Sequence, residues 1–155
     1  MMFQLIKKTL KENNFKIEKG EVRGAYCPGA YDLSIEGKKF CGIAQRRQLK
    51  AFNVQAFLNI ESSGENRANL VKRFYEIAAG QTLNNKVPVI IPEKMTSIQE
   101  ISQQWNVSRF LKTLDRHLIH MGGKRTNIDG LGLTHKKEID RISKELLMIS
   151  NKRLF

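Results

Sequence analysis

The chain has few of the residues and patterns that define several protein classes. Only two of its 155 residues are cysteines, which argues against a disulfide framework and leaves no second pair for a structural zinc site. No apolar run approaches the roughly 18 residues that a membrane-spanning helix needs. The N-terminal sequence MMFQLIKKTLKENN becomes charged too early to hold the apolar core of a signal peptide. We therefore expect a cytoplasmic protein with reduced thiols.

Acidic residues are also scarce. Lys and Arg number 27 against 15 Asp and Glu, so the net charge is +12. Such an excess attracts nucleic acid, anionic lipid or an acidic protein, although a generally cationic surface explains it as well. The charges are spread along the chain with no long basic block, which excludes a basic tail. The absence of a recognised module or an aromatic–basic strand pattern argues against a nucleic-acid-binding domain.

Alternating patterns in the first half predict a small antiparallel sheet. Residues 31–35 alternate between apolar and polar, and residues 38–45 return as a partner strand. Between them, Glu36 and Gly37 suit a two-residue turn, with glycine where positive φ is needed. Further extended segments are predicted over residues 16–23 and 52–60. Three or four strands are few for the helices that follow, so we expect the sheet to be incomplete in this chain.

Helical spacing dominates the second half. Ser62 with Glu65, and Ser97 with Glu100, have the spacing of a capping box. The helix over 64–79 is expected to turn five apolar residues inward: Leu70, Val71, Phe74, Ile77 and Ala78. Other helices are predicted over residues 2–13, from Asn106 or Ser108, and from Thr134. A strand-rich part (16–60) followed by a helix-rich part (62–155) predicts one α+β domain over 1–155 with a mostly antiparallel sheet.

The hairpin carries the polar and ionisable residues that are candidates for a functional site. A two-residue turn predicts the pairs Ile35–Lys38, Ser34–Lys39, Leu33–Phe40 and Asp32–Cys41. Alternation then assigns one face to the core: Tyr31, Leu33, Ile35 and Phe40. The opposite face carries Asp32, Ser34, Lys39 and Cys41, and is either solvated or the floor of a site. In the solvated alternative, Lys39 is a surface lysine and Asp32 its cross-strand partner.

Cys27 precedes this hairpin in a Pro-Gly turn. A lone cysteine is often a small buried apolar residue. A loop position and nearby cations favour a nucleophile instead, and a thiol close to an amine can carry covalent acyl chemistry. Cys41 is expected only to pack. His117 and His120 are three residues apart but lack a third ligand, so they and His135 are expected to be structural or solvent-facing.

The segments CPGAYDLSI (27–35) and GKKFCGIAQRR (37–47) resemble the lipoate–protein ligase A and octanoyltransferase family. The resemblance spans about Gly20 to Tyr75. It implies the α+β fold that this family shares with biotin protein ligases. Within the family, the chain is most similar to the amidotransferase branch, which moves octanoyl groups from the glycine cleavage H protein to lipoyl domains.

The resemblance implies a role for individual residues. Cys27 would take the acyl group as a thioester, and Lys39 would orient the acyl carbonyl and stabilise the developing oxyanion. The implied substrate-binding residues are Gly29, Tyr31, Asp32, Gly42 and Gln45. No cofactor or metal is implied. The implied partners are the octanoylated H protein and the lipoyl domains of 2-oxoacid dehydrogenases, whose acidic surfaces a +12 charge would attract.

The cysteine also separates this branch from its neighbours. ATP-dependent lipoate ligases use an adenylate and need no thiol, and the branch that uses acyl carrier protein carries a different motif around its cysteine. Family members are much longer, so we expect this chain to match their C-terminal portion. The alternative is a truncated, non-catalytic relative that binds lipoyl domains or self-associates through exposed sheet edges.

Overall fold

The computed structural model describes residues 1–48, 51–80, 88–125, 137, 140–141 and 144. The chain divides into two compact units, Met1–His117 and Leu118–Phe155. In the described part of the second unit, the last helix ends and the Gly122 and Gly123 amides donate to the carbonyls of Ile119 and Leu118. The helix start expected at Thr134 lies outside the described residues.

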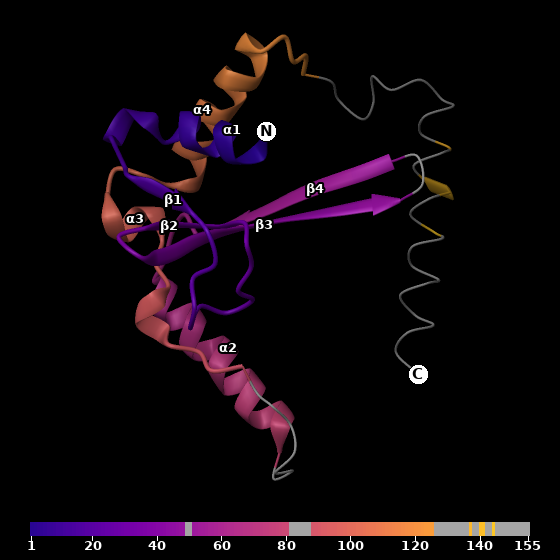
Figure 1. Cartoon of the computed structure of the whole chain (residues 1–155). Helices are drawn as coiled ribbons and strands as arrows, with labels where there is room; N and C mark the ends of the chain where they lie inside the picture. The colour runs from indigo at the N-terminus through magenta and orange to yellow at the C-terminus, as the bar shows by residue number, and fades with distance from the viewer. Residues whose placement is uncertain (49–50, 81–87, 126–136, 138–139, 142–143, 145–155) are drawn as a thin grey trace. The chain divides into compact units, whose positions relative to one another are not determined.

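The described strands form one antiparallel sheet in the order β1-β2-β3-β4 (Figure 1). Their bounds are β1 (Ile17–Lys19), β2 (Asp32–Ile35), β3 (Lys38–Gln48) and β4 (Ala51–Leu58). Each strand pairs with its neighbours in sequence, so only local connections are needed. The helices of the first unit, α1 (Met2–Thr9), α2 (Gly64–Ala79), α3 (Ile98–Ile101) and most of α4 (Val107–His120), complete an α+β fold. The predicted fold class is confirmed.

The turn of the β2–β3 hairpin lies where the sequence predicts it. Glu36 and Gly37 have φ values of 52° and 73°. Positive φ at both central residues is the geometry that matches the twist of a two-residue hairpin. The pair Ile35–Lys38 closes the turn, as expected.

Beyond the turn, the strand pairing shifts by one residue because β3 contains a bulge near Phe40. Cys41 pairs with Leu33 and Gly42 pairs with Asp32, so the predicted pairs Leu33–Phe40 and Asp32–Cys41 are wrong. An extra residue in one strand moves the following side chains to the other face. Cys41 therefore joins the core with no exposed surface, and a glycine lies opposite Asp32.

The second face of the hairpin is buried. Asp32, Ser34 and Lys39 are 2%, 5% and 0% exposed. The solvated alternative for this face is therefore wrong. Two of these side chains, Asp32 and Lys39, bind the backbone of the loop that joins β1 to β2, which offsets their lost hydration.

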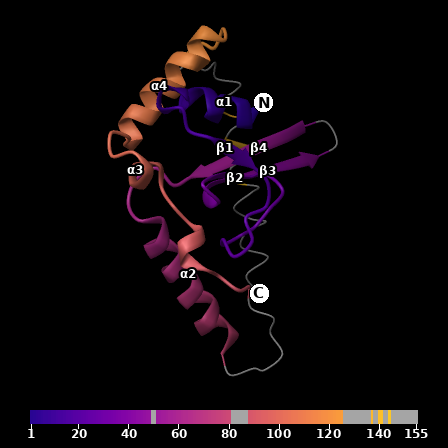
Figure 2. The same cartoon turned by 60° about the vertical axis from the view of Figure 1, so that its left-hand side comes forward.

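The β3 and β4 strands extend beyond the rest of the sheet as a two-stranded arm. Their pairing continues from Cys41–Leu58 to Gln48–Ala51. The β2 strand pairs with β3 only as far as Gly42. Figure 2 shows the arm projecting past the other strands. Within the described part of the chain, β4 is an edge strand of the sheet, as β1 is at the opposite side.

Buried side chains form two clusters. The larger joins α1, the sheet, α3 and α4 through Ile6, Leu10, Ile17, Leu33, Ile35, Phe40, Cys41, Ile60, Ile98, Trp105 and Phe110. The smaller joins the β1–β2 loop to α2 and the segment after it through Val22, Ala25, Ala68, Ile90 and Met95. The Trp105 indole N–H donates to Asn13 Oδ1 at 2.7 Å, so the largest core side chain is fully satisfied.

The start of α2 is fixed by a contact with the start of α3. Ser63, not Ser62, caps α2, so the predicted first capping box is wrong. The second box is confirmed, because the Ser97 hydroxyl accepts from the Glu100 amide while the Glu100 carboxylate accepts from the Ser97 amide. The same carboxylate oxygen accepts from the Gly64 amide at 3.0 Å. One glutamate therefore binds two helix starts.

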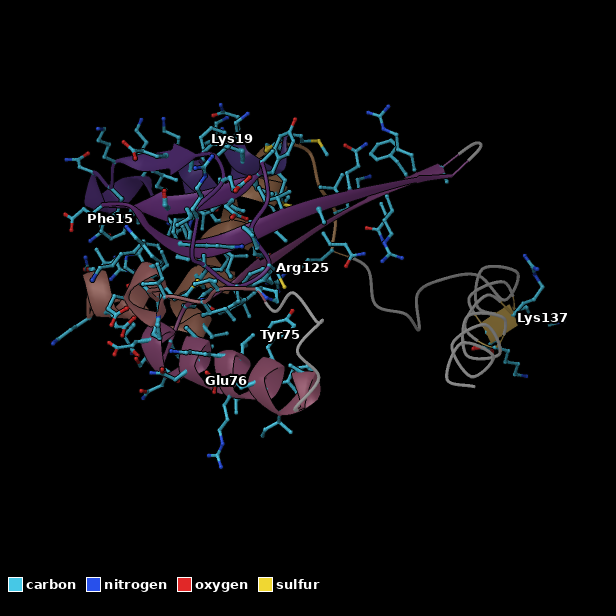
Figure 3. All side chains as sticks on the ribbon, turned by 60° about the horizontal axis from the view of Figure 1, so that its bottom comes forward. Phe15, Lys19, Tyr75, Glu76, Arg125 and Lys137 are labelled. Atoms are coloured by element: carbon cyan, nitrogen blue, oxygen red, sulfur yellow. The ribbon has the colours of Figure 1, made fainter. Side chains whose placement is uncertain are left out.

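The α2 helix buries a different face from the predicted one. Ala68 has no exposed surface, and Val71 and Tyr75 pack against the smaller cluster. Figure 3 shows the Tyr75 side chain extending from α2 toward the sheet. The expected inward residues Leu70, Phe74 and Ile77 are instead 70%, 65% and 71% exposed. Close packing of Gly64 against the Thr96 backbone sets the rotation of the helix, which helical spacing alone did not reveal.

Replacing Gly64 with alanine should destabilise the protein despite alanine's higher helix propensity. A Cβ at this position would lie 2.4 Å from the Thr96 Cα, which is backbone and has little freedom to move. We expect a loss of about 1–3 kcal/mol, the usual cost of overpacking. Denaturant unfolding measures it. Asn69→Ala, at an exposed site on the same helix, is the matched control, and equal stability of the two variants would contradict this contact.

The Glu100 carboxylate should make stability depend on pH. Its burial opposes ionisation, but hydrogen bonds from Gly64, Ser97, Ser63 and Thr96 outweigh this effect and lower its pKa from 4.5. A lowered pKa in the folded state stabilises above the unfolded pKa, and this stability is lost as pH falls through the folded value. Glu100→Gln should therefore reduce the free energy of unfolding at pH 7 more than at pH 3. Glu76→Gln, exposed on α2, serves as the control, and a pH-independent loss would contradict the linkage.

Candidate acyl-transfer site

Cys27 is exposed on a tight turn between β1 and β2. Its φ is 46°, a left-handed conformation that costs an L-residue about 1–2 kcal/mol. The turn closes when the Asp32 amide donates to the Gly29 carbonyl at 3.0 Å. The thiol is thus presented to solvent, and the alternative of a small buried residue does not hold.

A buried ion pair lies against this turn. The Lys39 Nζ is 2.8 Å from Asp32 Oδ1, and the two side chains are 0% and 3% exposed. The same ammonium donates to the carbonyls of Tyr26 at 3.0 Å and Cys27 at 2.7 Å. These three oxygens match the three N–H donors of a lysine. Lys39 is therefore a buried, fully hydrogen-bonded cation attached to the backbone of the cysteine turn.

The Asp32 carboxylate binds the loop with its other oxygen. Its Oδ2 accepts from the Gly29 amide at 3.0 Å and from the Val22 amide at 3.4 Å. Taking two charges out of water is costly unless the remaining hydrogen-bonding capacity is also satisfied. Here the backbone of the β1–β2 loop supplies those partners, so the loop and the ion pair stabilise each other.

Two aromatic rings border the cation. Tyr26 and Phe57 stack with ring centroids 6.0 Å apart and an interplanar angle of 21°. The Lys39 Nζ lies 6.0 Å and 5.5 Å from the two centroids. A Cβ on Gly42 would lie 2.5 Å from Phe57 Cε1, so a glycine is required where this ring crosses β3. The Tyr26 hydroxyl also pairs with the Asn59 side chain at 3.3 Å.

A cavity of about 360 Å³ opens beside Cys27. The turn of residues 27–29 and Asp32 form one side, while residues 42–44 of β3 and 55–57 of β4 form the other. Of these strand residues, Gly42, Ala44 and Ala56 are small, Ile43 and Phe57 are large and apolar, and only Gln55 is polar. A short aliphatic chain suits such a lining, because its burial needs no hydrogen-bond partners. A thiol at the edge of this cavity could attack a carbonyl carbon whose alkyl chain lies within it.

The structure brings together most of the predicted site residues. Cys27, Gly29, Asp32 and Gly42 line the cavity, and Lys39 contacts the Cys27 turn from its buried position. Two predicted residues lie elsewhere. Tyr31 is 56% exposed with the Lys19 ammonium 4.8 Å from its ring centroid, and Gln45 is exposed on the arm.

Sequence reasoning missed Tyr26, Phe57 and the β4 wall of the cavity. Residues 52–60 were predicted only as an extended segment, so no side chain of β4 was assigned to the site. The feature that could have indicated Phe57 is Gly42, which pairs directly with it across the β3–β4 ladder. A glycine opposite a large aromatic residue indicates a ring that covers the neighbouring strand.

Cys41 is buried, whereas Cys27 is exposed. Burial raises the pKa of the Cys41 thiol to about 12, with the Lys39 ammonium opposing this effect and Asp32 adding to it. Cys41 has no exposed surface. It packs in the larger cluster, in agreement with its expected packing role.

Metal and membrane features are absent from the residues that the structure describes. No group of three or more His, Cys, Asp or Glu side chains in these ranges could hold a metal ion. No described helix is long and apolar enough to cross a bilayer. His117 is half-buried and His120 exposed on α4, and His135 lies outside the described residues.

The lipoyl protein ligase A/B catalytic domain profile matches residues 1–119. The chain belongs to this family. Its relatives include proteins named octanoyl-GcvH:protein N-octanoyltransferase from Exiguobacterium sibiricum, 42% identical over 127 residues, and Lysinibacillus sphaericus, 48% identical over 102 residues. A protein of the same name from Geobacillus kaustophilus is 39% identical over 125 residues. The alignments cover 81%, 65% and 79% of this chain, respectively.

The same alignments cover only 46%, 37% and 44% of the three relatives. The chain therefore spans less than half the length of the curated relatives it matches. The matched region includes the cysteine turn, the hairpin and the arm, since the family profile extends over all of them.

Alkylation should distinguish the two cysteines. At pH 8 we expect iodoacetamide to modify Cys27 and to leave Cys41 free, because Cys27 is exposed and almost none of the Cys41 thiol is ionised. Intact mass should show a single addition, which peptide mapping assigns. Cys27→Ser should abolish it and Cys41→Ser should not. Two fast additions to the folded native chain would contradict the burial of Cys41.

Proposed function

We propose that this chain carries the nucleophilic part of an octanoyltransferase of protein lipoylation. It would move an octanoyl or lipoyl group from the glycine cleavage H protein to lysines of lipoyl domains. One observation carries the proposal: an exposed cysteine at the edge of an apolar cavity, next to a buried lysine, in a chain of this family. The names of the relatives support the octanoyl group and the donor protein.

The reaction has two halves. The Cys27 sulfur attacks the carbonyl carbon of the octanoyl-lysine amide, forming a C–S bond and a tetrahedral oxyanion. Collapse of this intermediate breaks the C–N bond, and the thiol proton ends on the departing lysine amine. An acceptor lysine amine then attacks the thioester, and the thiol is regenerated. Dividing amide exchange in this way replaces one difficult step with two easier ones.

Lys39 is the proposed partner of the acyl carbonyl, as the family resemblance implies. Its ammonium already contacts three oxygens, so donation to the acyl oxygen requires it to exchange one of these contacts. Gly29, Asp32 and Gly42 belong to the proposed binding site as parts of the cavity lining. Tyr31 and Gln45 lie farther along the same hairpin, where they would contact the carrier protein.

A second candidate function is supported by the open arm. The β4 strand is an edge strand and Phe52 near its start is 66% exposed. Unpaired strand edges are sites for pairing with another chain. In this alternative the chain binds lipoyl domains or a second copy of itself without catalysing transfer.

Octanoyl transfer is tested by incubating the chain with octanoylated H protein and measuring its intact mass. We expect one octanoyl adduct that hydroxylamine removes, since a thioester is labile and an amide is not. Cys41→Ser should retain the adduct and Cys27→Ser should lose it. No adduct on the native chain, together with retained binding to a lipoyl domain, would favour the non-catalytic alternative.

A further inference from the structure

We propose that the buried pair of Asp32 and Lys39 is a positioning device for Cys27. In this proposal the pair holds the Cys27 backbone in its left-handed conformation and so directs its thiol toward the cavity. This role acts through the backbone of the turn and is separate from the contact with the acyl carbonyl proposed for Lys39. The proposal rests on the proposed function only where it gives the pair a role in acyl transfer. The conformation of the turn can be tested without acyl transfer.

The contacts of Lys39 fix both peptide planes that flank Cys27. The Tyr26 carbonyl belongs to the plane before the Cys27 Cα, and the Cys27 carbonyl to the plane after it. Because peptide units are planar, their orientations set φ and ψ of the residue between them. One ammonium binds both carbonyls, at 3.0 Å and 2.7 Å. Successive carbonyls diverge in an extended backbone, so their convergence on one cation favours a helical type of conformation.

Asp32 holds the other end of the same turn. Its Oδ1 pairs with the ammonium at 2.8 Å, while its Oδ2 accepts from the Gly29 amide at 3.0 Å. The pair therefore binds the backbone of the turn at Cys27 and at Gly29. Both charges are almost completely buried, so removing either one alone leaves the other without its partner.

A left-handed conformation at a residue other than glycine persists only where its surroundings enforce it. Within the turn of residues 27–29, Cys27 alone has such a φ, and the following Pro28 and Gly29 do not. In the described structure the direct hydrogen bonds to the carbonyls on either side of Cys27 come from Lys39. The strain is thus located at the residue proposed to react.

The test compares alanine with glycine at position 27, with and without the ion pair. Cys27→Ala and Cys27→Gly are each made in the native background, in Asp32→Asn, and in the combined Asp32→Asn and Lys39→Met background. The combined background removes both charges together, which avoids an unpaired buried charge and serves if Asp32→Asn alone does not fold. Denaturant unfolding of the full chain gives the equilibrium constant for each protein.

We expect a reversal of the order of stability. In the native background the glycine variant should unfold with an equilibrium constant about fivefold or more lower than the alanine variant, because alanine is strained at positive φ. Without the pair the turn should relax, and alanine should become the more stable variant because glycine loses more backbone entropy on folding. The same glycine advantage in every background would overturn the proposal, since the turn would then hold its conformation unaided.

Octanoyl loading provides a second readout that a purely structural role would not change. In the Asp32→Asn background with Cys27 and Lys39 intact, loading should slow by about a hundredfold, the effect of misplacing a reacting group, while iodoacetamide still modifies the exposed thiol at a near-native rate. Equal losses in both rates would indicate a lost turn and would count against positioning. If the native chain takes no octanoyl group, the proposed function fails, and the stability comparison still decides the positioning role.

Discussion

The buried contact between Lys39 and Asp32 is the constraint on which the rest of this site depends. It joins β3 to β2 at 2.8 Å and binds the carbonyls and amides of the loop that carries Cys27. A charged pair without exposed surface is costly to bury, and the loop backbone makes it tolerable by satisfying the remaining donors and acceptors. Without the two charged side chains, the loop would lose the hydrogen bonds that hold its backbone in this conformation. The contacts that stabilise the loop are therefore also those beside the proposed nucleophile.

The surroundings of the pair show how a small sheet can form a largely apolar cavity. Gly42 lets the Phe57 ring cross β3, and the ring stacks on Tyr26 beside the lysine. Small residues of β3 and β4 then leave a cavity next to the cysteine. Asp32 of the ion pair lines this cavity together with the apolar strand residues. A polar group beside an apolar lining suits the proposed reaction, in which a carbonyl needs hydrogen bonds and its alkyl chain needs none.

Local signals predicted much of the fold and failed where packing decided. The Glu36-Gly37 turn and the Ser97–Glu100 capping box were found because their geometry depends on neighbouring residues. The bulge near Phe40 was missed, since no residue there requires it and the shift follows from the pairing of β2 with β3. The rotation of α2 was missed because it depends on the approach of Gly64 to Thr96, which lies far away in sequence.

The sequence by itself determined the α+β class, the hairpin and the two residues, Cys27 and Lys39, that carry the family resemblance. Residue types, turn chemistry and period-two alternation are sufficient for these features because each is a property of adjacent residues. Only the tertiary structure decided that the polar face of the hairpin is buried, that Cys41 belongs to the core, and that the lysine binds the backbone of the cysteine turn. These depend on contacts between segments, where burial and hydrogen-bond satisfaction select one arrangement from several that the sequence pattern allows.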